Sequence, residues 1–337
     1  MLTHGQLAFV VTNHLADLMP GLTERDASLV VAPLSHGAGI HQLSQVARGA
    51  VTVLTAGEKL DPAEAWALVE RHRISTMFTV PTILNALVRH PAVDAHDHAS
   101  LRHVVYAGAP MYEADQAHAL AKLGPCLVQY FGLGEVTGNI SVLRPDQHVP
   151  ENAGSCGVAR TGMEIAILDD AGARLPPDAI GEICVRGPAV FAGYFENEDA
   201  NARAFAGGWF HTGDLGRLDA RGFLWITGRA SDMYISGGSN VYPREAEEAI
   251  LTHPAVAECA VVGLPHPKWG EAGVACVVPR DGASVNEAAV LAHLRDRIAR
   301  YKQQLRVVVW DALPKSGYGK VPKALVKARL VEEEVSF

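Results

Sequence analysis

The sequence predicts an α/β fold: a doubly wound parallel layer, then a small β-barrel module, then a small α+β domain. Three observations support this prediction. Helix-like and strand-like segments alternate through residues 1–150, which is typical of a parallel sheet covered by helices. Short strands between Gly, Pro, Asp and Asn turns occupy residues 151–230. Residues 231–337 return to mixed helices and strands, so we expect boundaries near 150 and 230.

The expected helices start or stop at residues that favour helix ends. Residues 2–19 carry apolar residues at helical spacing and stop at Pro20, and Asp61-Pro62 begins a helix that runs to Arg73. The other expected helices cover residues 39–48, 81–89, 113–123, 243–253 and 286–300. The expected strands cover residues 28–33, 50–55, 76–80, 101–107, 127–131, 164–168, 181–186, 222–227, 257–264, 273–279 and 305–310. Ligands of such sheets bind beyond the carboxyl ends of the strands. The candidate positions are therefore the turns after Val31, Val80, Tyr106 and Tyr130.

The composition is that of an ordinary globular protein, with 337 residues, 48% apolar and 20% charged. A net charge of −8 argues against a partner that is nucleic acid or an anionic membrane. The five cysteines are scattered, odd in number and form no Cys-x-x-Cys, which predicts reduced thiols and neither disulfides nor a zinc site. No apolar run is long enough to form a transmembrane segment, and Met1 is followed by no basic signal sequence. These features predict a cytoplasmic protein.

A glycine-rich stretch at residues 207–243 contains the residues with the clearest chemistry. Asp214 can accept hydrogen bonds from two ribose hydroxyls, and Arg229 can bind phosphate or ribose oxygens with a planar fork of donors. The glycines allow the backbone to approach a ligand closely. The stretch therefore predicts a nucleotide-binding corner beside a flexible joint. On these residues alone, two glycine turns in a β-rich domain remain the alternative.

The segment Trp209-Phe-His-Thr-Gly-Asp214, followed by Gly228-Arg229-x-x-Asp232, resembles the adenylate-forming (AMP-binding) superfamily. This superfamily includes acyl-CoA synthetases, the adenylation domains of peptide synthetases and firefly luciferase. The resemblance implies that residues 1–150 and 151–230 are two parts of the AMP-binding domain. It also implies that residues 231–337 form a mobile C-terminal domain, which rotates about a hinge at Ser231 and Asp232.

The resemblance implies a nucleotide site at two of the turns. The turn Gly108-Ala109-Pro110 would line the adenine pocket. Phe131 would stack on adenine beside Gly132, and Glu135 would hold Mg²⁺ against the phosphates, a role that suits a carboxylate. The family pattern is aromatic-Gly-x-Thr-Glu, but this chain has Gly134 in place of the threonine that contacts phosphate. Either Thr137 replaces that contact or the contact is weaker.

The same glycines also resemble a dinucleotide-binding fingerprint, Gly132-x-Gly134-x-x-x-Gly138. That fingerprint requires a helix after the glycines. The residues that follow, 139–143, read as a strand, so we interpret the match as coincidental.

The resemblance bears on four further segments. His36, in Pro33-Leu34-Ser35-His36, would gate or orient the acyl group, although a histidine in a simple turn is the alternative. Lys320 would catalyse adenylation, because a cation between an attacking carboxylate and a phosphate offsets their repulsion. Lys315 and Lys323 are expected to be surface charges. Ser236, Gly237 and Gly238 would leave room for the pantetheine arm of CoA, whereas block 181–194 is assigned a structural role only.

One family block has no counterpart in this sequence. The family carries a phosphate loop immediately before a segment like Leu2-Thr3-His4, so the resemblance covers the C-terminal two-thirds of such an enzyme and lacks the N-terminal part. A truncated reading frame, a misplaced start and a split protein all remain open. We expect exposed apolar surface, and with it a homo-oligomer or a partner that supplies the N-terminal half.

Together these residues predict an AMP-forming acyl-CoA synthetase fragment. It would use ATP, Mg²⁺, CoA and a fatty or aromatic carboxylic acid. No carrier domain follows Phe337, which favours CoA as the acceptor. Three alternatives stay open: an adenylation domain that loads a separate carrier protein, an inactive AMP- or CoA-binding remnant, and a nicotinamide oxidoreductase.

Overall fold

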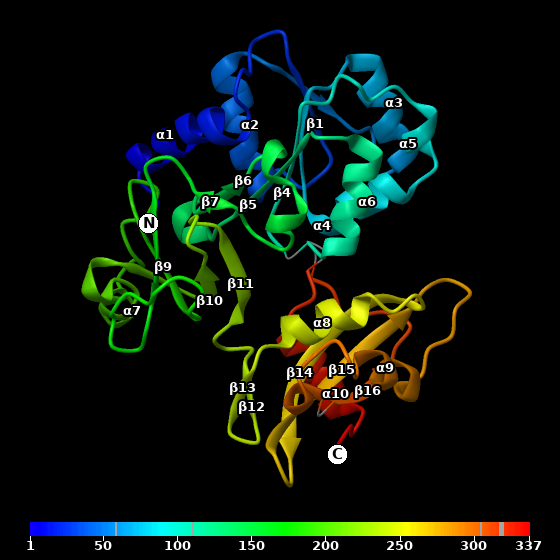
Figure 1. Ribbon diagram of the computed structural model, residues 1–337. Helices are drawn as coiled ribbons and strands as arrows, with labels where there is room; N and C mark the ends of the chain where they lie inside the picture. The colour runs from blue at the N-terminus through cyan, green and yellow to red at the C-terminus, as the bar shows by residue number, and fades with distance from the viewer. Residues whose placement is uncertain (58, 110, 304, 317–319) are drawn as a thin grey trace. The chain divides into compact units, whose positions relative to one another are not determined.

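The computed structural model describes residues 1–57, 59–109, 111–303, 305–316 and 320–337. Within them the chain folds into two compact units (Figure 1). The first unit comprises Met1–Thr212 and Gly216–Ile226, and the second comprises Gly213–Leu215 and Thr227–Phe337.

The first unit contains every helix and strand that the sequence predicts for residues 1–150. Its helices are α1 (His4–Asn13), continued by a π-helical turn (His14–Leu18), α2 (Gly37–Arg48), α3 (Pro62–His72), α4 (Pro81–Arg89), α5 (Ala92–Ala95), α6 (Glu113–Leu123) and α7 (Glu198–Ala204). The strands up to residue 159 are β1 (Ala27–Val30), β2 (Val51–Leu54), β3 (Thr76–Thr79), β4 (His103–Tyr106), β5 (Leu127–Phe131), β6 (Ser141–Leu143) and β7 (Val158–Ala159). Asp61 caps α3, because its carboxylate accepts hydrogen bonds from the backbone of Ala63 and Glu64.

Strands β1 to β7 form one sheet in the order β2-β1-β3-β4-β5-β6-β7. The first five strands are mutually parallel, and β6 and β7 join as antiparallel strands. The chain order reverses between β1 and β3, as in doubly wound sheets whose ligands bind at that switch point. The predicted parallel, doubly wound layer is confirmed.

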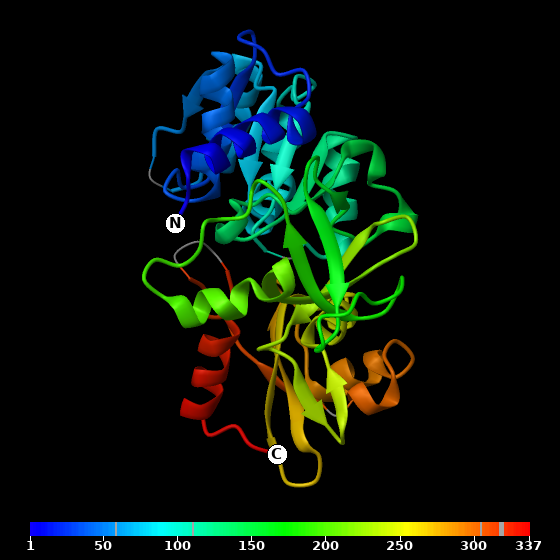
Figure 2. The ribbon, with the colours of Figure 1, turned by 90° about the vertical axis from the view of Figure 1, so that its left-hand side faces the viewer.

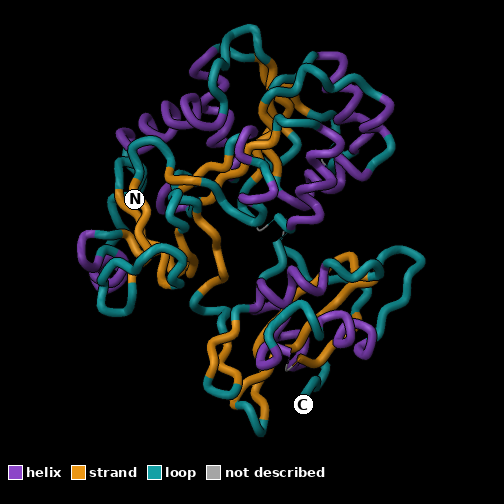
Figure 3. The backbone as a smooth tube through the Cα atoms, in the orientation of Figure 1, coloured by secondary structure: helices purple, strands orange, loops and turns teal. Residues whose placement is uncertain are grey.

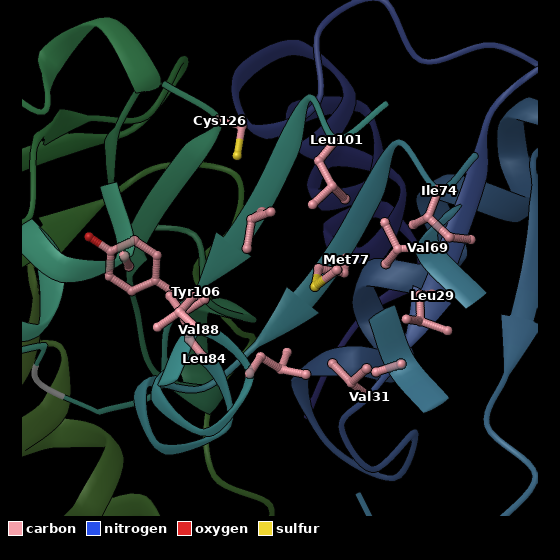
Figure 4. Packing of buried hydrophobic residues seen from close by; sticks show 14 of the residues in the cluster. Leu29, Val31, Val69, Ile74, Met77, Leu84, Val88, Leu101, Tyr106 and Cys126 are labelled. Carbon is pink, nitrogen blue, oxygen red and sulfur yellow. The ribbon is translucent and has the colours of Figure 1, made fainter. Parts of the chain in front are cut away.

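Helices cover both faces of this sheet. On one face, side chains of α3, α4 and α6 pack against alternate strand residues such as Leu29, Met77 and Val104 (Figure 4). On the other face, Leu18, Met19 and Ala38 pack against Phe78 and Val105. Successive residues of a strand point to opposite faces, and both faces are covered by helices, so every residue of β3 and β4 is buried.

The β-rich module follows in the chain. Its strands are β8 (Glu164–Leu168), β9 (Gly181–Arg186), β10 (Phe210–Leu218) and β11 (Leu224–Arg229), in the order β11-β10-β9-β8. The module belongs to the first unit except for Gly213–Leu215 in β10 and the end of β11 from Thr227. Leu224 also exchanges backbone hydrogen bonds with Cys156 and Gly157, at 2.7 and 2.8 Å, which joins β11 to the segment before β7. Strand β10 was not predicted, because its two glycines weaken the strand pattern. Gly216 is required there, since a Cβ at this position would lie 2.5 Å from the carbonyl oxygen of Trp225.

The second unit is a sheet with helices on both faces (Figures 2 and 3). Its strands are β12 (Tyr234–Ser236), β13 (Ser239–Val241), β14 (Val256–His266), β15 (Gly270–Pro279) and β16 (Leu305–Val309). Its helices are α8 (Pro243–Leu251), α9 (Glu287–Leu294) and α10 (Lys323–Glu332). Helices α8 and α9 pack on one face, and α10 packs on the other with Trp310 and Leu313. The helix expected over residues 286–300 stops at Leu294, and α10 was not predicted.

Among the described residues, no helix combines the length and the apolar character that crossing a membrane requires.

Candidate functional site

Asp214 and Arg229, the pair that the sequence singled out, are in direct contact. Asp214 lies in β10, Arg229 ends β11, and the Arg229 Nε donates a hydrogen bond to Asp214 Oδ1 at 3.0 Å. Neighbouring strands bring them together although they are separated by fifteen positions. The Asp214 side chain is only 6% exposed, whereas that of Arg229 is 57% exposed. A buried carboxylate therefore anchors a guanidinium that is accessible to a ligand.

Lys320 adds a second cation to this pair. Burial and, to a smaller extent, the positive charge of Arg229 lower the pKa of Lys320. Its carbonyl oxygen accepts a hydrogen bond from the Ser316 N–H at 2.7 Å, which holds the two sides of the predicted catalytic loop together. Residues 317–319 lie outside the described residues. Arg229 is paired with Asp214, but the positive charge of Lys320 near it makes the region attractive to an anion such as a phosphate or carboxylate.

The other two lysines of this segment differ from each other. Lys315 forms an ion pair with Glu258 at 2.8 Å and is partly exposed, as expected for a surface charge. The same expectation is wrong for Lys323, which contacts the buried Glu247 and donates a hydrogen bond to the Val261 carbonyl at 2.8 Å. Glu247 belongs to α8, 76 positions away along the chain, so no local pattern indicated this pairing.

The expected hinge residues form a turn directly after β11. The N–H groups of Asp232 and Met233 both donate to the Arg229 carbonyl, at 3.0 and 3.2 Å. Ser231 is exposed, and its hydroxyl lies 3.4 Å from Asp232 Oδ1. The Ala230 N–H donates to the Gly213 carbonyl at 3.1 Å, so the turn is tied to the residue before Asp214.

The loop after β5 contains the expected adenine and magnesium residues. Phe131 ends β5 and packs, partly buried, against the core of the β-rich module. A Cβ at Gly132 would lie 2.2 Å from the backbone of Gly138, so glycine is required for this close approach. Residues Gly134–Val136 form a single 3₁₀ turn, and β6 follows instead of a helix. The predicted strand is thus confirmed, and the segment lacks the strand–turn–helix context of a dinucleotide fingerprint.

Glu135 is oriented by residues to which the sequence analysis gave no role. The Tyr194 hydroxyl donates to Glu135 Oε1 at 3.0 Å, and the Phe191 N–H donates to the Glu135 carbonyl at 2.7 Å. Burial and the Glu135 carboxylate raise the pKa of Tyr194, which keeps its hydroxyl a donor. Tyr194 ends the block that was assigned a structural role only, and its contact with Glu135 spans 59 positions.

Thr137 is held in place from the N-terminal helix. It is buried, and its hydroxyl oxygen accepts a hydrogen bond from Gln6 Nε2 at 3.1 Å. Gln6 also donates to the Ala189 carbonyl at 2.8 Å. This position among protein groups does not favour Thr137 as a replacement for the phosphate-contacting threonine.

His36 and the Gly108 turn follow the carboxyl ends of β1 and β4. His36 is exposed and directly precedes α2, where its side chain makes no capping hydrogen bond, next to the switch point between β1 and β3. Gly37 is required after it, because a Cβ there would lie 2.9 Å from the Phe78 ring. Gly108 has a φ of 84° and is exposed, and Ala109 is half-buried. The third residue of that turn, Pro110, lies outside the described residues. Parallel strands end at a shared edge, so these turns and the loop after β5 gather there.

The segment expected to bind CoA forms a hairpin turn between β12 and β13. Gly237 and Gly238 have φ angles of 57° and 83°, the conformation of the tight two-residue turn that glycine favours. The Gly237 N–H donates to the Trp269 carbonyl at 2.9 Å. Ser236 is buried. The two glycines therefore have a structural reason to be present, whether or not CoA binds here.

Comparisons with known proteins agree with these motifs. A sequence model of the AMP-binding enzyme family matches residues 1–195, and one of the AMP-binding enzyme C-terminal domain matches residues 245–320. A feruloyl-CoA synthase of an Amycolatopsis species is 38% identical over 98% of this chain, which spans 66% of that relative's length.

Solved structures show the same fold. The amide bond synthetase McbA from Marinactinospora thermotolerans is 34% identical with a TM-score of 0.90, over 96% of this chain and 66% of that chain. ATP-bound MatB from Rhodopseudomonas palustris is 30% identical with a TM-score of 0.90, over 99% and 66%. The chain spans about two-thirds of the length of each of these proteins, and it belongs to the AMP-binding enzyme family.

Proposed function

We propose that this chain supplies the AMP-binding and C-terminal parts of an AMP-forming acyl-CoA synthetase. A carboxylate oxygen of the acid attacks the α-phosphorus of ATP and pyrophosphate leaves, which gives an acyl adenylate. The thiol of CoA then attacks the acyl carbon, and AMP leaves with the bonding electrons. The hydrogen bond between Arg229 and Asp214, with the charge of Lys320 close enough to influence Arg229, carries this proposal, because it brings a ribose acceptor and two cations together.

In this proposal each residue has a defined role. Asp214 accepts hydrogen bonds from the ribose hydroxyls while Arg229 holds it in place. Lys320 stabilises the negative charge that develops when two anions react. Glu135 binds Mg²⁺ at the phosphates, with its carboxylate positioned by Tyr194. Gly108, Ala109, Pro110 and Phe131 form the adenine pocket, His36 orients the acid, and residues 236–238 line the path of CoA.

The name of the feruloyl-CoA synthase relative favours an aromatic acid and CoA as the substrates. The amide bond synthetase McbA favours a second candidate, in which an amine takes the place of CoA in the second step. Both candidates share the adenylation step, so they differ only in the nucleophile that attacks the acyl adenylate. Offering CoA, a pantetheinylated carrier protein and simple amines to the same adenylate distinguishes them.

Binding of AMP to residues 1–337 tests the proposal most directly. By calorimetry we expect Asp214→Ala to weaken AMP binding by about 10- to 100-fold, the value of hydrogen bonds to a charged group. Asp178→Asn is the control, since this exposed aspartate of the same module forms an ion pair with Arg217, and asparagine tolerates its φ of 65°. Equal AMP affinity in the parent and the Asp214 variant would show that the corner is structural. Binding of NAD but not AMP would favour the oxidoreductase instead.

A further inference from the structure

A second group of chemically active side chains lies on the β-rich module, apart from Asp214. Glu182 and Cys184 are two positions apart in β9, so both point to the same face of the sheet. His211 lies on the adjacent strand β10. The ligand atoms of the three side chains lie within 4.8 Å of one another, and they form the one such group of His, Cys, Asp and Glu among the described residues.

The two contacts of His211 place a proton or a cation between its ring and the Glu182 carboxylate. Its Nε2 lies 3.2 Å from the Ala206 carbonyl oxygen, which can only accept, so Nε2 carries the hydrogen. Its Nδ1 lies 2.7 Å from Glu182 Oε2, which also accepts when ionised. Two acceptors cannot face each other at this distance unless a proton or a cation lies between them. A metal-ligating histidine shows the same pattern, because it donates its other N–H to a carbonyl or carboxylate.

The thiol of Cys184 completes the group. Its Sγ lies 3.4 Å from the same Nδ1, and the residue is fully buried. A thiol binds a metal as the thiolate, so binding of a metal would release its proton. Imidazole, thiolate and carboxylate together are a typical donor set for Zn²⁺.

We propose that Glu182, Cys184 and His211 bind a zinc ion that clamps β9 to β10, with water as the fourth ligand. Tetrahedral zinc would separate Nδ1 and the carboxylate oxygen by roughly 3.3 Å. Glu182 must then withdraw slightly, which its partly exposed side chain permits. Cysteine spacing did not predict this site because the ligands come from two strands, 29 positions apart between Glu182 and His211.

The test uses the whole chain, stripped of metal by a chelator and then titrated with Co²⁺ and Zn²⁺. We expect one ion per chain and a near-ultraviolet thiolate-to-cobalt absorption band, which Zn²⁺ abolishes. Affinity should rise with pH, since binding releases the Cys184 proton. Cys184→Ala and His211→Gln should each weaken binding more than the roughly 10- to 100-fold seen on removing a hydrogen-bond partner of a ligand.

Cys126→Ala is the matched control. Cys126 is also buried in the first unit, but it belongs to no group of metal ligands among the described residues. The wild-type cobalt spectrum decides the question even if a variant misfolds. Absence of the thiolate band, or equal affinity in the parent and the Cys184 variant, overturns the proposal. Retention of both His211 N–H protons in NMR spectra with excess Zn²⁺ would do the same, because it identifies an imidazolium–carboxylate pair.

Discussion

The sheets of the two units differ in how their apolar surfaces are covered. In the second unit, neighbouring residues of β14 point into two separate cores: Val261 packs beneath α8 and α9, and Val262 packs beneath α10. In the first unit, the edge strand β2 leaves Val51 and Leu54 more than half exposed, and Val46 on α2 is 72% exposed. A covered sheet is stable on its own, whereas an apolar edge invites self-association or a partner.

Acid is expected to destabilise the first unit far more than the second, and this is the largest difference that we expect between them. Burial lowers the pKa of His41 to about 3 and of His103 to about 4, and burial with the charge of Arg160 holds His14 far below its usual value. Below about pH 6.5 the unfolded chain binds protons that the folded unit excludes. The free energy of unfolding should then fall by about 1.4 kcal/mol per pH unit for each histidine as the pH drops from 6 to 4.

Hydrogen exchange followed by mass spectrometry checks this expectation for each unit separately. Peptides of the first unit should lose protection between pH 7 and pH 5, after correction for the intrinsic exchange rate. Peptides of β14, β15 and α10 should change little. Parallel losses in both units would contradict the assignment to these histidines.

Removing Lys323 should destabilise the second unit nearly as much as acid destabilises the first. Lys323→Ala leaves the Glu247 carboxylate buried without its cation, which costs about 3–5 kcal/mol. Lys315→Ala is the control, because its exposed pair with Glu258 contributes only about 0–1 kcal/mol. Urea unfolding gives both values. A double change, Lys323→Met with Glu247→Leu, should recover much of the loss, and failure to recover would mean that the site tolerates no apolar packing.

Lys320 should affect chemistry rather than stability. The test uses a hybrid protein, in which this chain is joined to the third of the feruloyl-CoA synthase that it does not match. In this hybrid, Lys320→Ala should slow acyl-AMP formation by about 10²–10³-fold. Transfer of the acyl group from supplied acyl-AMP should be largely unchanged. Lys315→Ala, in the same segment, should leave both steps intact. Equal losses in both half-reactions would remove the catalytic role that we propose for Lys320.

Charges on the apolar edge should have the smallest effect on stability, within about 0.5 kcal/mol for surface positions. Val46→Lys with Leu54→Lys should nevertheless reduce self-association of residues 1–337, measured by sedimentation at several concentrations. Leu325→Lys is the control, because it introduces a charge at an exposed position of α10 in the second unit and should leave self-association unchanged. If the unchanged chain is already monomeric at high concentration, the exposed apolar edge does not cause self-association.

The sequence predicted the parts of this protein whose signals are local. Alternating apolar segments and helix-ending residues such as Asp61 and Pro62 predicted the parallel layer. Strand β10 was missed because its glycines weaken the apolar pattern that predicts a strand. One of them, Gly216, is needed for close packing against Trp225. The contacts of Glu135 with Tyr194 and of Lys323 with Glu247 join distant segments, so they required the folded structure. The roles of the nucleotide and CoA residues stay predictions.

The short segment Gly213–Leu215 has a consequence for exchanging domains between relatives. Although it lies within β10, it belongs to the second unit, as does Arg229 at the end of β11. A chimera joined at Thr227 would therefore combine Asp214 of one parent with Arg229 of the other, and the Gly213–Ala230 backbone bond would span the junction. Swaps that carry residues 213–230 as one segment keep this corner intact, so recombination points before Gly213 or after Ala230 should give more functional chimeras.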